Sequence, residues 1–153
     1  ALNKSMFTSA VQKAQLEIIR ALAFHFDEIF PAVKSALDFE LFDEPILKKL
    51  GGLLIKEKTG VELSAVIDHF DDRQEKELVS EILFDEVHPD DPVQIIQECL
   101  ATLKGRLIKD QIKTARLKMR ELESLDQDTE AIILEVAELQ KQLQDLTVSL
   151  DRE

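Results

Sequence analysis

Apolar residues recur at intervals of three and four along most of this chain, as they do on one face of a helix. No segment alternates between apolar and polar residues with the period of two that is typical of a strand. The first clear stripe lies in residues 15–24, and a second short helix is expected over residues 26–37. The pattern therefore predicts an all-α fold.

Capping residues mark where the next helix begins. Residues 43–45 combine an N-cap with a proline in the first turn, and they predict a helix that runs to residue 58 and ends at Gly60. Gly51 and Gly52 lie inside this helix, where each costs about 1 kcal/mol relative to alanine. We expect the pair to mark close helix packing or a kink.

Shorter helices are expected in the middle of the chain. Residues 62–70 predict one, and Asp71 with Gln74 forms a D-x-x-Q capping box that starts another, which continues to residue 84. Residues 88–91 then predict a turn before the next helix.

A long helix is predicted from Pro92 to about residue 122, with Asp91 as its N-cap. Its apolar stripe first follows Val93, Ile96, Leu100, Leu103 and Leu107, and it then restarts one residue later at Ile108, Ile112, Ala115, Met119 and Leu122. One residue turns about 100° around a helix. The helix is therefore predicted to leave one packed unit and to enter another.

The second unit is predicted to be an antiparallel helical hairpin. Residues 125–128 form a short polar turn, with Asp126 or Asp128 as the N-cap of the last helix. That helix carries a heptad seam formed by Ile132, Val136, Leu139, Leu143, Leu146 and Leu150. We expect a helical bundle over residues 1–104 and the hairpin over residues 105–153.

Charge is unevenly distributed over the 153 residues, whose formal net charge is −12. Residues 61–98 hold two basic and twelve acidic residues, residues 104–120 hold seven basic and one acidic, and residues 121–153 hold two basic and ten acidic. We expect the basic and acidic arms to face each other across the hairpin. An acidic chain without Trp or Tyr argues against nucleic acid as a direct partner.

Catalytic and metal-binding patterns are weak. The three histidines are scattered, residues 68–72 are interpreted as a capping loop rather than a metal site, and no glycine-rich phosphate loop is present. Cys99 is expected to be a buried structural thiol. We therefore expect no active site, no metal and no cofactor. With no membrane span and no secretory signal in the sequence, we expect a cytoplasmic module of a longer polypeptide.

Some apolar residues lie off both seams, near the tip of the predicted hairpin: Leu117, Leu125, Ile133 and Leu134. A hairpin with extra apolar residues at its tip suggests a docking element for another protein.

Short motifs in order along the chain, at residues 16–22, 43–45, 98–100 and 126–130, resemble the C-terminal, helicase-binding domain of bacterial replicative primases. The resemblance implies a bundle that modulates helicase activity and a hairpin that docks onto the amino-terminal domains of the hexameric helicase. It makes single-stranded-DNA-binding protein a further partner to test. The docking residues then expected are Leu117, Leu125, Ile133, Leu134, Leu146, Leu150 and Arg152. The chain departs from the family pattern at Phe26 and at the Gly51–Gly52 pair.

Three alternatives stay open at this stage. The amino-terminal domain of the replicative helicase has a similar fold. The heptad seam could also pair between chains, which would make this a self-associating coiled-coil adaptor. A small hydrolase or metal enzyme would need a site around His69.

Overall fold

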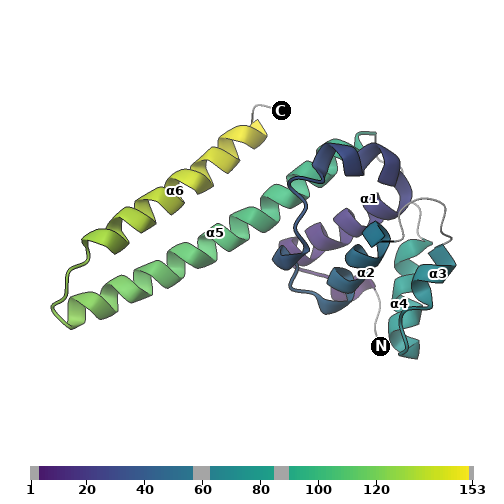
Figure 1. The fold of residues 1–153 in the computed structure, drawn as a ribbon, viewed down its shortest axis with the longest axis horizontal. Helices are drawn as coiled ribbons and strands as arrows, with labels where there is room; N and C mark the ends of the chain where they lie inside the picture. The colour runs from purple at the N-terminus through teal and green to yellow at the C-terminus, as the bar shows by residue number, and fades with distance from the viewer. Residues whose placement is uncertain (1–3, 57–62, 85–89, 152–153) are drawn as a thin grey trace. The chain divides into compact units, whose positions relative to one another are not determined.

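The computed structural model describes residues 4–56, 63–84 and 90–151. Over these residues the chain forms six α-helices and two short 3-10 helices and contains no strand, which confirms the all-α prediction (Figure 1). The 3-10 helices are η1 (Lys4–Met6) and η2 (Phe39–Leu41). The chain divides into two compact units, residues 1–103 and residues 104–153. The sequence pattern predicted this boundary one residue later, after residue 104.

The first helix, α1 (Ala10–Val33), is longer than predicted and contains a kink. It begins at Ser9, whose Oγ accepts from the Gln12 N–H at 3.0 Å while Gln12 Oε1 accepts from the Ser9 N–H at 3.1 Å. This reciprocal capping box starts the helix five residues before the expected stripe. His25 leaves helical geometry, with φ −134° and ψ 34°, between the two helices that were expected.

Four further helices complete the first unit: α2 (Pro45–Lys56), α3 (Leu63–Ile67), α4 (Arg73–Leu83) and the first part of α5 (Pro92–Ser124). Together with α1 they enclose one apolar core. Its largest fully buried side chains are Phe70, Ile18, Ile19, Leu22, Ile29, Leu47, Leu50, Leu78, Ile82, Leu83, Ile96 and Leu103.

The start of α2 is held against α1 by two glutamines. Gln15 is fully buried; its Nε2 donates to Asp43 Oδ1 at 2.6 Å, and its Oε1 accepts from the Glu44 N–H at 3.1 Å. Gln12 Nε2 donates to Glu44 Oε1 at 2.7 Å. Because the Glu44 carbonyl accepts the first helical bond, from Lys48, Glu44 rather than Asp43 is the N-cap of α2.

Several predicted boundaries need correction. The start of α4 is capped by Asp72 and not by Asp71, since Asp72 Oδ1 accepts from the N–H groups of Gln74 at 2.7 Å and Glu75 at 3.2 Å. In the described chain α2 reaches Lys56 and α3 covers only five residues. The predicted stop at Gly60 and the turn at His88 lie outside the described residues.

The second unit is the hairpin formed by the rest of α5 and by α6 (Glu130–Asp151), which run side by side in Figure 1. Ile108, Ile112, Ala115, Ile132 and Val136 are buried between them, flanked by Met119, Leu122, Leu139, Leu143 and Leu146. The predicted seam is therefore confirmed for these residues. Leu107, which continues the stripe of the first unit, is 43% exposed, whereas Ile108 is 8% exposed.

Candidate docking surface

The residues around His69, which were the candidates for a metal or hydrolase site, make structural contacts. No cluster of three or more His, Cys, Asp or Glu residues that could hold a metal ion occurs there. Lys49 Nζ donates to the His69 carbonyl at 2.9 Å and lies 4.5 Å from the centre of the Phe70 ring. These two contacts of Lys49 hold α2 against the turn before α4.

The Cys99 thiol is poorly suited to nucleophilic chemistry. Its burial, with smaller contributions from the carboxylates of Glu17 and Glu98, raises its pKa to about 11. A thiol needs a lowered pKa to present a reactive thiolate near neutral pH. Cys99 packs against the core of the first unit instead.

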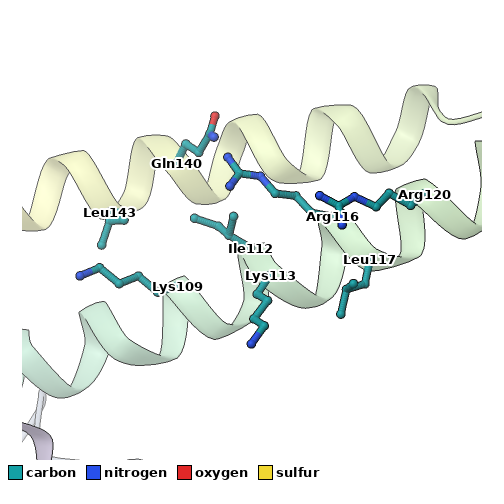
Figure 2. Close-up of a pocket in the computed structure, with 8 residues that line it drawn as sticks. All are labelled: Lys109, Ile112, Lys113, Arg116, Leu117, Arg120, Gln140 and Leu143. Carbon is teal, nitrogen blue, oxygen red and sulfur yellow. The ribbon is translucent and has the colours of Figure 1, made fainter. Parts of the chain in front are cut away.

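The hairpin carries a groove of about 540 Å³ along one of its long sides. We call it the basic groove; it is lined by Lys109, Ile112, Lys113, Arg116, Leu117 and Arg120 of α5 and by Gln140 and Leu143 of α6. Figure 2 shows Ile112 and Arg116 extending toward α6, whereas Lys113 and Leu117 point away from it.

The four cations of the basic groove form a stripe because they are spaced by four, three and four residues along α5. The α6 wall opposite them is uncharged over three turns. Stepping from Gln140 by helical intervals reaches Ile133, Ala137 and Gln144, and all four of these residues are exposed.

These four cations form no hydrogen bond or ion pair with any residue that the structure describes. The ion pair found in the described hairpin joins Arg106 Nε to Asp110 Oδ2 at 3.2 Å, within α5. The expectation that the basic and acidic arms face each other is therefore wrong for these four cations, whereas Lys118 of the basic arm does line a groove together with Glu135 of the acidic arm. The reason is geometric, since the cations share a side with the uncharged residues of α6.

Three acidic residues of α6 lie on another side of the hairpin. A second groove, of about 400 Å³, is lined by Asp110, Gln111, Thr114, Ala115 and Lys118 of α5 and by Ile132, Glu135 and Leu139 of α6. Glu138 and Asp145 follow Glu135 at helical spacing and are also exposed. This side of the hairpin thus carries carboxylates of both helices beside Lys118, whereas the lining of the basic groove has four cations and no carboxylate.

Four of the residues expected to bind a partner are exposed on the hairpin. Leu117 is 56% exposed, Leu125 60%, Ile133 50% and Leu134 65%. Leu117 lines the basic groove, and Leu125 lies in the turn between the helices. These large apolar side chains contribute little to the hairpin core.

The other three expected residues differ. Leu146 is half-buried and packs against the hairpin core, so less of its surface is open to a partner. The Leu150 side chain and Arg152 lie outside the described residues. The groove cations were not among the residues predicted to form a site, although their spacing and the uncharged positions of α6 are both present in the sequence.

No helix in the described part of the chain combines the length and the apolar character needed to cross a membrane. Comparisons with protein-family models, with curated proteins and with solved structures found no match for this chain.

Proposed function

We propose that this chain is a non-catalytic docking module of a bacterial primase, which attaches the primase to the hexameric replicative helicase in the cytoplasm. The hairpin is the docking element, and the helical bundle of the first unit modulates helicase activity. The observation that carries this proposal is the set of exposed leucine and isoleucine side chains on a two-helix unit.

Exposed apolar side chains at the tip of the hairpin would favour binding of a partner that covers them. Burying a large apolar side chain contributes about 1.5–3 kcal/mol, and the exposed Leu125, Ile133 and Leu134 lie in or near the turn of the hairpin. A partner that covered this tip would gain from several such side chains at once. The resemblance of the chain to helicase-binding domains supports the amino-terminal domains of the helicase ring as that partner.

The test is binding of the chain to the helicase hexamer from the same organism, measured by size-exclusion chromatography with light scattering. We expect the chain to comigrate with the hexamer. The double variant Leu125→Ser with Leu134→Ser should bind at least about tenfold more weakly, as expected when central apolar contacts are lost.

Leu107→Ser is the matched control, because Leu107 is also an exposed leucine of the hairpin but lies at the opposite end from the turn. It should bind within about twofold of the unaltered chain. A stable dimer that ignores the helicase would contradict the proposal and support a self-associating coiled coil. Equal binding after removal of residues 105–153 would show that the hairpin is not the docking element.

A further inference from the structure

We infer that the hairpin binds the helicase through its basic groove, and that the occupant of the groove is an acidic amphipathic helix of the helicase. This inference rests on the proposed function. It specifies which side of the hairpin makes the contact and which chemistry the partner presents there.

The charge pattern of the groove defines the first requirement on the occupant. Lys109 and Arg120 are eleven residues apart on α5, so the cation stripe is about 16 Å long. A partner helix lying along it would match the stripe over three turns if it carried carboxylates at positions i, i+4, i+7 and i+11. Since the four cations lack ion-pair partners in the described structure, such a helix would supply the missing negative charge.

The apolar lining of the groove defines the second requirement. Ile112 and Leu143 belong to the hairpin core and contribute to the lining, and the exposed Leu117 adds a further apolar side chain. A helix that fits must therefore place apolar side chains beside its carboxylates. This is the pattern of an amphipathic helix that lies in a groove.

A second copy of this chain does not fit the groove well. In a symmetric dimer centred on the basic groove, the same surface of both copies meets, so the two cation stripes would lie close together. Contact between the basic groove of one copy and the acidic residues of another, such as Glu135 and Glu138, joins two different surfaces. Such a contact closes into a ring or continues as an open chain of copies, so it does not limit assembly to a pair.

Nucleic acid is also a poorer occupant than an acidic helix. All eight Phe residues lie at or before Phe84, and the chain has no Trp or Tyr, so residues 104–153 offer no ring on which a base could stack. The net charge of −12 opposes the approach of a polyanion, whereas a short acidic helix needs to meet only the groove.

The experiment measures the affinity of the full chain for the helicase hexamer by fluorescence anisotropy at two salt concentrations. The groove variant, Lys113→Glu with Arg120→Glu, changes two exposed cations outside the hairpin core. We expect its affinity to fall at least about tenfold, and its binding to depend less on salt than that of the unaltered chain. The milder Lys113→Gln with Arg120→Gln should show an intermediate loss.

The matched control is Lys118→Glu with Lys141→Glu, which makes the same change in net charge at exposed positions outside the basic groove. It should keep its affinity within about twofold. Circular dichroism of each variant establishes that the hairpin is folded. An equal loss in both double variants would indicate a general charge effect and would overturn the inference.

Other results separate the inference from the proposed function. If the unaltered chain does not bind the helicase, the proposed function and the groove inference both fail. If it binds and the groove variant binds equally well, only the groove inference fails. Binding of a twenty-nucleotide oligothymidine by the unaltered chain, lost in the groove variant, would identify the groove as a nucleic-acid site and overturn the acidic-helix assignment.

Discussion

Gly51 and Gly52 are adjacent in α2, yet their surroundings differ completely. A Cβ atom placed on Gly51 would lie 2.7 Å from Cζ and 2.9 Å from Cδ1 of the Phe39 ring, closer than packed side chains come. A Cβ atom on Gly52 would have no atom outside its own helical turns within 4 Å. Phe39 packs edge-on against Phe42, with ring centres 5.1 Å apart. Close packing therefore explains Gly51, and nothing in the structure requires Gly52.

We predict opposite effects for the two alanine substitutions. Gly51→Ala should lower the free energy of unfolding by about 1–3 kcal/mol, because the Phe39 ring must move. Gly52→Ala should raise it by up to about 1 kcal/mol, since alanine is the better helix former and the site is open. Urea unfolding followed by circular dichroism at 222 nm measures both. Equal effects of the two substitutions would contradict the packing explanation.

The turn between α5 and α6 is set by how α5 ends. The Gln127 N–H donates to the Leu122 carbonyl at 2.9 Å, and the Asp126 N–H donates to the Glu123 carbonyl at 3.1 Å. These two bonds form a Schellman motif with Asp126 in the left-handed region, at φ 58°. Thr129 is the N-cap of α6, because its carbonyl accepts the first helical bond, from the Ile133 N–H at 3.0 Å, so the predicted N-cap at Asp126 or Asp128 is wrong. Asp128 lies one residue before the cap, and its Oδ1 accepts from the Glu130 N–H at 3.0 Å.

The two aspartates should therefore respond oppositely to the same substitution. Asp126→Gly should stabilise the hairpin by about 0.5–1 kcal/mol, because glycine adopts positive φ without strain and the change removes a negative charge beside a helix C-terminus. Asp128→Gly should destabilise it by a few tenths to about 1 kcal/mol, because the Glu130 N–H at the start of α6 loses its side-chain acceptor. Hydrogen exchange of the hairpin amides measures both, and stabilisation by Asp128→Gly would refute the assignment.

The seam of each helix was predictable because the spacing of apolar residues is a local property. The shift of the apolar stripe by one residue in α5, for example, correctly indicated that Ile108 rather than Leu107 is buried in the hairpin. Contacts between distant segments were not predictable in this way. No local pattern indicates that Gln15 bonds Asp43 and the Glu44 N–H, twenty-eight and twenty-nine residues away. The basic groove was not predictable for the same reason, because its lining depends on which residues of α6 face the cations of α5.

The two units differ in how much apolar surface they bury. In the described chain the core of the first unit contains twenty-two buried side chains, whereas the hairpin core contains five. Conformational entropy opposes folding in proportion to the number of ordered residues, so a unit with few buried side chains has a small net stability. We therefore expect the hairpin to open more readily than the bundle, although α5 belongs to both.

Native-state hydrogen exchange of the full chain tests this expectation. Amides of residues 108–122 and 132–146 should exchange through openings of lower free energy than amides of residues 16–22. Ile112→Ala should lower the opening free energy of the hairpin amides by about 2–4 kcal/mol and leave residues 16–22 unchanged.

Leu50→Ala is the matched substitution in the core of the first unit, where Leu50 is fully buried. It should lower the opening free energy for residues 16–22 by about 2–5 kcal/mol while the amides of the hairpin beyond residue 108 keep theirs. The reason is that a substitution destabilises the cooperative unit to which its contacts belong, and Leu50 and Ile112 lie in different cores. If each substitution shifted every amide equally, the chain would unfold as one cooperative unit, and the separation of bundle and hairpin stability would be wrong.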